Sequence, residues 1–308
     1  MRPVVVEHGS TLADAAAVVA GIGALIVIGA TIREFWRRTL GRRSDRYGRL
    51  SRLGTGAHLS FFTAVLGEPP AMSRTVLKTD FKEFIGSNDP AFEPTSEGPQ
   101  VRLVSARFGV STFIDRDYFV QAITDQDQTV IAYSVTTRSN WFRPVLEIPR
   151  RPGPITRLRW RRKFGLWRPV VRVKLGRTKF ADFDPPNPDG FNGPHLRVNM
   201  GAHNHAYSEI EYKGNPGYYQ SFAWTASDAA RQGRFGLGMS VQREVGGNEW
   251  PNQEDPSAGP AWQAMPETQR FRRETVTTTY TVIGPSLWLE NYPLERFGPW
   301  VDEVRTLA

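Results

Sequence analysis

The pattern of apolar and polar positions changes abruptly near the start of the chain. Residues 15–32 read AAAVVAGIGALIVIGATI and contain no charged side chain. A run of about 18 apolar residues predicts a transmembrane helix, since such a helix covers roughly 27 Å of bilayer. The alternatives are a buried core helix and a cleaved signal peptide. Residues 33–52 carry eight arginines against Glu34 and Asp45. Because basic residues mark the cytoplasmic side, we expect residues 1–14 outside and the rest in the cytoplasm, at the plasma (inner) membrane.

A helical period follows in residues 53–70, LGTGAHLSFFTAVLGEPP. Leu59, Phe62 and Leu66 fall on one stripe, which is typical of a helix that covers a core with one face. Gly67 is suited to the left-handed position that ends a helix, and the two prolines after it prevent continuation. These residues predict one short amphipathic helix, and residues 33–52 form a basic stem before it.

Most of the remaining chain alternates with the period of a β-strand. Residues 112–123 and 129–137 predict a hairpin whose turn is 124–128, with Ile131, Tyr133 and Val135 on the buried face. Further β-rich runs lie at 72–85, 170–175, 196–212, 218–227 and 273–283. The chain therefore predicts an α+β fold, in which the transmembrane helix precedes a mainly antiparallel β-rich soluble region with few short helices. We expect two modules in that region, 53–142 and 143–308.

Composition and charge limit the kinds of chemistry and binding partner that the chain can have. The chain has no cysteine, which excludes disulfides, thiolate metal sites and a cysteine nucleophile. Its net charge of +8 is uneven: residues 143–179 carry thirteen Lys and Arg against Glu147, residues 33–52 carry a net +6, and the rest has −10 by difference. A basic side beside a predicted membrane anchor indicates anionic lipid headgroups as the partner.

The predicted membrane or phosphate contacts come from both basic stretches. In the second stretch, aromatic residues are interleaved with cations at helical spacing, which suits a bilayer interface. The alternatives are a solvated positive face with buried aromatics, and a nucleic-acid surface without a recognition motif. The predicted contact residues are Arg37, Arg38, Arg42, Arg43, Arg159, Trp160, Arg161, Arg162, Lys163 and Trp167.

The sequence contains few candidate catalytic or metal-ligating residues. His203 and His205 share one strand face with Tyr207 and Glu209, and His-x-His is a metal-ligand spacing. On a straight strand His205 and Glu209 would lie roughly 13 Å apart, so a site would need a carboxylate from a neighbouring strand. The alternative is a polar sheet face with cross-strand pairs. The sequence contains no phosphate loop, dinucleotide fingerprint or nucleophile elbow, and we expect no cofactor.

Several segments carry a resemblance to a known family. They are EFWRRTLGRR, FFTAVLGEPP, DRDYFVQAITDQDQTVIAYSVTTR, VKLGRTKFADF, YSEIEYKGNPGYYQSF, TYTV and FGPWVDEVR. Together they resemble an uncharacterised bacterial family known by a locus-tag name, the "ETEC domain" family. The resemblance implies a single-pass membrane protein and assigns no activity. The helix ending in LGEPP before a β-hairpin is also similar in fold to lipoprotein modules of the SmpA/OmlA kind, although those carry a lipidated cysteine.

Three functional hypotheses follow from these patterns. The leading one is a membrane-tethered cytoplasmic binding or sensing module, which is not an enzyme and which has its basic face near the inner leaflet and a protein partner. The second is a membrane-anchored enzyme, such as a hydrolase, with a site around 203–211. The third is a nucleic-acid-contacting component that uses residues 143–179.

Overall fold

The structure is a computed structural model. It describes residues 41–85, 100–139, 142–149, 170–183, 195–201, 204–213, 220–227, 266–287, 291–300 and 302–303. The predicted transmembrane segment 15–32 lies outside these ranges. Within them, no helix is both long enough and apolar enough to cross a membrane. Contacts divide the chain into two units, residues 1–49 and 50–308.

The described elements are mostly strands, with few short helices. They are α2 (Arg42–Leu50), α3 (Leu59–Leu66), β1 (Met72–Phe84), β2 (Val101–Ile114), β3 (Tyr118–Thr124), β4 (Val130–Thr137), β5 (Val145–Pro149), β6 (Val170–Lys174), η2 (Phe180–Asp182), β7 (His195–Gly201), β8 (Asn204–Lys213), β9 (Gln220–Ser227), α7 (Pro266–Glu274) and β10 (Thr279–Ile283). The predicted mainly antiparallel β-rich region is confirmed. The helix α2 lies within residues 33–52, the predicted basic stem.

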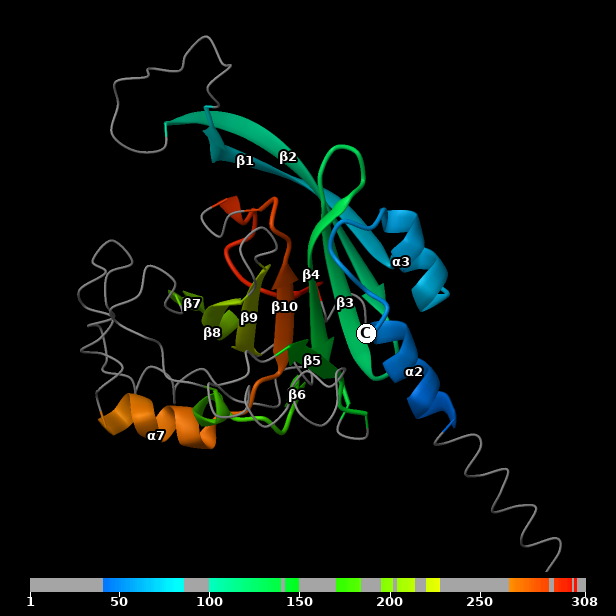
Figure 1. Ribbon diagram of the computed structural model, residues 1–308, viewed down its shortest axis with the longest axis vertical. Helices are drawn as coiled ribbons and strands as arrows, with labels where there is room; N and C mark the ends of the chain where they lie inside the picture. Colours follow the sequence, from blue (N-terminus) through cyan, green and yellow to red (C-terminus); the bar gives the residue numbers. More distant parts are fainter. Residues whose placement is uncertain are drawn as a thin grey trace, which may run out of the picture. The chain divides into compact units, whose positions relative to one another are not determined.

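One eight-stranded antiparallel sheet organises the second unit (Figure 1). Its strand order is β1-β2-β3-β4-β10-β9-β8-β7, and β5 pairs with β6 in a separate two-stranded sheet. The strand β10 lies between β4 and β9 and pairs with both. One sheet therefore draws strands from both predicted modules, 53–142 and 143–308.

Helices and loops cover one face of this sheet. Phe62 of α3 packs edge-on against Tyr133, with ring centroids 5.6 Å apart, and the Tyr133 hydroxyl donates to the Leu53 carbonyl. Farther along the same face, Phe183 stacks on Trp224 and Phe271 of α7 packs against Tyr207. Apolar side chains from segments far apart in sequence thus bury this face. We call it the helix-covered face.

The C-terminal segment covers the opposite face, which we call the C-terminal face. Tyr292, Leu294 and Phe297 join a buried cluster with β-strand residues such as Val110 and Ile283. Hydroxyl side chains on this face pair across strands, as between Ser134 and Thr281 and between Thr136 and Thr279. These pairs satisfy hydroxyls that would otherwise be buried without partners.

One prediction about burial in residues 129–137 is wrong, because both faces of the sheet are covered. The sequence places only the Ile131, Tyr133 and Val135 side of the second hairpin strand in the core. All eight residues of β4 are buried, because helices cover one face and the C-terminal segment covers the other. The hairpin itself is confirmed, with β3 paired to β4 around the predicted turn.

The predicted strand 112–123 is wrong as one continuous element. It is two strands, because the chain turns at residues 115–117, where the Asp115 amide donates to the Tyr118 carbonyl. The first part belongs to β2, which begins at Val101 and pairs with all but a few residues of β1. The predicted strand 273–283 is also too long, since α7 continues to Glu274 and β10 begins at Thr279.

Candidate functional site

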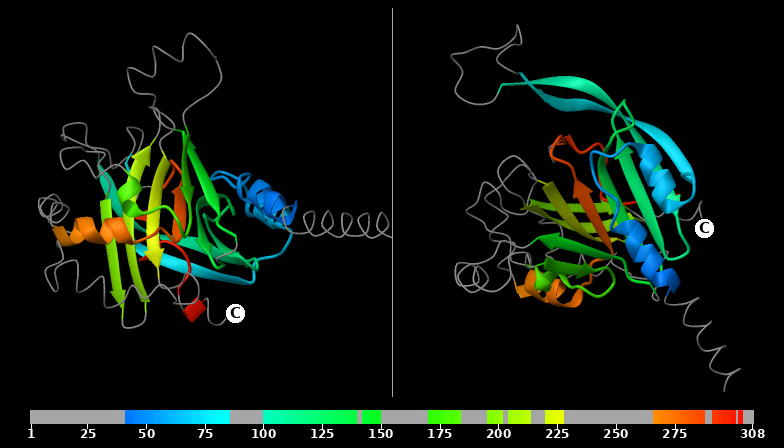
Figure 2. Two further views of the ribbon diagram at one scale, coloured as in Figure 1. Left: turned by 90° about the horizontal axis from the view of Figure 1, so that it is seen from below. Right: turned by 45° about the vertical axis from the view of Figure 1, so that its right-hand side comes forward.

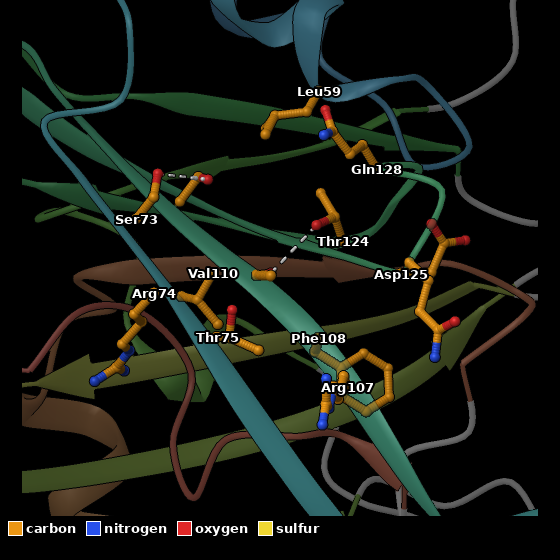
Figure 3. A pocket seen from close by; sticks show the side chains of 13 residues that line it. Leu59, Ser73, Arg74, Thr75, Arg107, Phe108, Val110, Thr124, Asp125 and Gln128 are labelled. Carbon is orange, nitrogen blue, oxygen red and sulfur yellow. Dashed lines mark hydrogen bonds between the residues drawn. The ribbon is translucent and has the colours of Figure 1, made fainter.

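A hollow of about 450 Å³ lies at the β1 end of the helix-covered face (Figure 3). Strands β1 and β2, the turn between β3 and β4, and the first residue of α3 form its walls. The lining side chains are mainly hydroxyls, amides and charged groups, with three apolar residues among them. The lining residues are Leu59, Ser73, Arg74, Thr75, Arg107, Phe108, Gly109, Val110, Ser111, Thr124, Asp125, Gln126 and Gln128.

Strand register brings the small hydroxyl residues together. Ser73 lies opposite Ser111, and their hydroxyl oxygens are 3.1 Å apart. Gly109 lies between Thr75 on β1 and Thr124 on β3. A Cβ at Gly109 would lie 2.5 Å from the Thr124 hydroxyl oxygen, so only glycine allows this close approach. Small side chains at neighbouring positions leave the strand surface open.

The turn beside the hollow is held by its own hydrogen bonds. The Asp125 carboxylate accepts from the backbone amides of Asp127 and Thr129, at 3.0 and 2.8 Å. The Gln128 carbonyl accepts from the Leu59 amide, which ties the turn to the start of α3. The carboxylate of Asp125 thus stabilises the turn, in the manner of an Asx-turn.

The two arginines of the hollow have different surroundings. The Arg74 guanidinium lies 2.6 Å from the Glu303 carboxylate, whose other oxygen accepts from the Gln121 amide and the Trp300 backbone. Arg107 is exposed and forms no ion pair within the part of the chain that the structure describes. The hollow therefore presents one cation that forms no ion pair with the described residues, together with hydroxyl groups and the Asp125 carboxylate.

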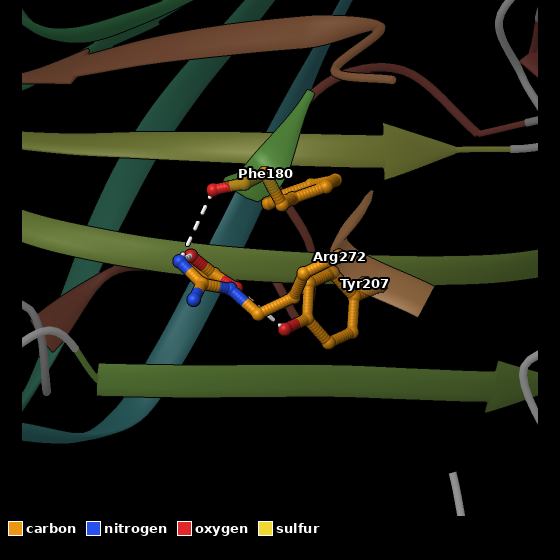
Figure 4. Close-up of polar contacts among 4 residues, drawn as sticks. Phe180, Tyr207 and Arg272 are labelled. Atoms are coloured by element: carbon orange, nitrogen blue, oxygen red, sulfur yellow. Dashed lines mark hydrogen bonds and ion pairs between the residues drawn. The ribbon is translucent and has the colours of Figure 1, made fainter. Parts of the chain in front are cut away.

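A second polar centre lies buried beneath α7 (Figure 4). Arg272 donates to both oxygens of Glu209, at 2.8 and 3.2 Å, and also to the Phe180 carbonyl. The Tyr207 hydroxyl donates to Glu209 at 2.6 Å. Burial, followed by the neighbouring Glu209 charge, raises the pKa of Tyr207 well above its ordinary value. All three side chains are buried, so the group fastens α7 to the sheet and offers no surface to a ligand.

The structure places only some of the sequence-predicted site residues. His203 lies outside the described residues, and His205 lies in β8 opposite Met200. Tyr207 and Glu209, on the same strand, bond to each other and to Arg272. Within the described ranges no group of three or more His, Asp or Glu is arranged to hold a metal ion. The metal site at His203 and His205 stays a prediction.

Most predicted membrane contacts also lie outside the described residues. Arg42 and Arg43 begin α2, whereas Arg37 and Arg38 precede it and the residues from Arg159 to Trp167 are not described. Sequence reasoning missed the hollow and Arg107. The available signal was the alternation of polar Ser105 and Arg107 with apolar Ala106 and Phe108, which is typical of a strand with one exposed face.

Comparison with known proteins adds no relative. The chain matches no protein-family model, no curated protein and no solved structure.

Proposed function

We propose that this chain is a membrane-tethered binding module with its ligand site in the hollow between β1, β2 and the β3–β4 turn. The uncharged run 15–32 is the tether. The arginine-rich stem after it favours a single-pass protein of the inner membrane, with its amino terminus outside and its β-rich region in the cytoplasm. Anionic headgroups are the lipid partners of the stem.

The exposed Arg107 beside clustered hydroxyls is the observation that carries the binding site. A guanidinium donates two parallel hydrogen bonds to a phosphate or carboxylate, which gives it geometric preference for such anions. Serine and threonine hydroxyls both donate and accept, so they suit a ligand with further polar groups. The hollow therefore fits a small molecule that bears a phosphate or carboxylate.

Isothermal titration of the purified full chain in detergent tests this site, with glycerol 3-phosphate and citrate as probes. We expect at least one probe to bind the wild type and to lose about tenfold in affinity on Arg107→Ala, as removal of a charged hydrogen bond does. Arg102→Ala is the matched control, since Arg102 lies on the same strand and its Nε pairs with Glu83. Equal binding by the Arg107→Ala protein, or no binding of either probe, contradicts the site.

The proposed membrane topology is tested by a separate experiment. A tag at the carboxyl end of the chain, followed by protease treatment of spheroplasts, reports the side on which the β-rich region lies. We expect the tag to survive until the membrane is opened. Removal of the tag from intact spheroplasts would place the region outside and contradict the argument from the arginines.

A further inference from the structure

The β1–β2 hairpin has two chemically different faces. One face turns inward: Val76, Phe81 and Ala106 pack against the buried cluster beneath the C-terminal segment. On the opposite face the described side chains are exposed as far as Arg107, and we call this exposed part the outer face of the hairpin; Ser111, farther along the same face, is buried. The described residues of the outer face are Ser73, Thr75, Leu77, Lys82, Val101, Leu103, Ser105 and Arg107.

The outer face combines exposed apolar side chains with cations. Leu77, Val101 and Leu103 are 56%, 44% and 66% exposed. Leu77 lies opposite Arg107 and Leu103 lies opposite Lys82, so each leucine has a cation as its cross-strand neighbour. None of the eight residues is acidic. The nearby Asp80 lies at the β-bulge of β1, where its carboxylate is 3.4 Å from the Lys78 ammonium.

The hairpin reaches beyond the rest of the sheet, which makes this face accessible. The strand β3 pairs with β2 only from Gly109 onward, so residues 101–108 of β2 extend past it. Figures 1 and 2 show the two strands curving beyond the end of β3. The leucines and Val101 lie on this extended part, next to the hollow that Arg107 helps to line.

At Lys82 the edge of β1 is not open to hydrogen bonding with a partner strand. Lys82 donates its backbone N–H to the Asn291 side chain and accepts from the Asn291 amide, both at 2.7 Å. Because these backbone groups bond a side chain and not β2, they belong to the open edge of the sheet. Asn291 therefore occupies the hydrogen-bonding positions that a partner strand would need at this point.

We infer that the outer face of the β1–β2 hairpin docks on an anionic bilayer surface, with its leucines and Val101 in the interface and Lys82 and Arg107 against lipid phosphates. Apolar side chains beside cations, with no acid among the described residues of the face, suit an interfacial surface. This docking rests on the membrane tether proposed above, which keeps the region close to a bilayer. It also turns the hollow toward the lipid phosphates, so the anion that the hollow takes is a lipid headgroup.

The absence of cysteine from the chain makes a direct test possible, because one introduced cysteine is the only labelling site. The full chain carrying Leu103→Cys is labelled with nitrobenzoxadiazole and reconstituted into vesicles that contain doxyl-labelled lipid as quencher. Two compositions are compared, phosphatidylcholine alone and phosphatidylcholine with about 30% phosphatidylglycerol. Arg102→Cys is the matched control, because Arg102 directly precedes Leu103 in β2 and its side chain points to the opposite face of the hairpin.

We expect the doxyl lipid to quench the label at position 103 by about half in the anionic vesicles and much less in phosphatidylcholine. The label at position 102 should show little quenching in either. Exchanging Lys82→Gln and Arg107→Gln together should remove the difference between the two compositions. If Leu103→Cys fails to fold, Leu77→Cys provides the same measurement from the other strand of the hairpin.

Equal quenching at positions 102 and 103, or none at 103, overturns the docking. A blue shift at 103 without quenching also overturns it, because that result means a protein covers the face. Flotation of the same vesicles after alkaline carbonate separates the two proposals. Loss of the protein from the vesicles refutes the tether, whereas a retained protein with an unquenched label refutes the docking alone.

Discussion

Replacing Arg272 with methionine should destabilise the protein strongly. The Arg272 guanidinium is buried and donates two hydrogen bonds to Glu209 and one to the Phe180 carbonyl. Methionine retains much of the side-chain volume but supplies no donor. Figure 4 draws Arg272 and Tyr207 as donors to the Glu209 carboxylate, which is only 4% exposed. Of these two donors, only the Tyr207 hydroxyl would remain in the variant.

The expected cost follows from leaving a buried charge uncompensated. Removing one partner of a buried ion pair costs about 3–5 kcal/mol in the free energy of unfolding. For a unit of this size, about 2–4 °C of melting temperature corresponds to each kcal/mol, so the midpoint should fall by roughly 6–20 °C. Exchanging Glu209→Gln in the Arg272→Met protein should recover part of this loss. Glutamine still accepts from Tyr207, and the buried charge is gone.

Equilibrium unfolding in urea, followed by tryptophan fluorescence, measures these free energies. Trp224 is fully buried on the same face of the sheet and reports its opening. Arg273→Met is the matched control, because Arg273 is the exposed neighbour in the same helix and should change stability by less than about 0.5 kcal/mol. An Arg272→Met protein as stable as Arg273→Met, or further destabilisation of Arg272→Met by Glu209→Gln, would show that the buried charge of Glu209 does not depend on Arg272.

Three further predictions concern backbone strain, the sheet edge and alkaline pH. Gly298→Ala should lower the free energy of unfolding by about 1–3 kcal/mol in thermal unfolding, because φ is +92° there and the added Cβ would lie 3.0 Å from a threonine hydroxyl oxygen. The control Gly48→Ala in α2 should leave stability unchanged or raise it slightly. Asn291→Ala removes both hydrogen bonds to the Lys82 backbone and should speed hydrogen exchange of the Lys82 amide, with normal exchange contradicting the edge contact. Burial raises the pKa of Tyr207 and Tyr280 above the ordinary value of 10.0. Above that pH the unfolded chain loses these protons first, so stability should fall by about 1.4 kcal/mol per pH unit for each tyrosine, and absorbance at alkaline pH should show them ionising only on unfolding.

Local signals in the sequence were sufficient for some elements. The helix α3 ends where expected, with Gly67 in the left-handed conformation at φ 80°. The β3–β4 hairpin also forms, because the Asp125 carboxylate organises its short turn. Each depends on contacts between residues that are close in sequence.

Other elements depend on distant contacts and could not be read from the sequence. The segment PETQRFRRE of α7 has a single large apolar residue, and it is Phe271 packing on Tyr207, with the buried ion pair of Arg272, that holds the helix on the sheet. The hollow likewise requires the register of β1 against β2, which sets Thr75 opposite Gly109. Alternation reveals the two faces of a strand but not which strand lies beside it.

The position of β10 has a consequence for how the protein is made. Ser134 and Thr281, paired in the middle of the sheet, are 147 positions apart in sequence. A ribosome therefore completes β1 to β4 and β7 to β9 before it supplies the strand that joins them. Until then the growing chain has two unsatisfied edges, β4 and β9, that can pair with other chains. Stalled or clipped chains that lack β10 should therefore aggregate during synthesis and depend on chaperones, whereas a chain that includes β10 closes the sheet.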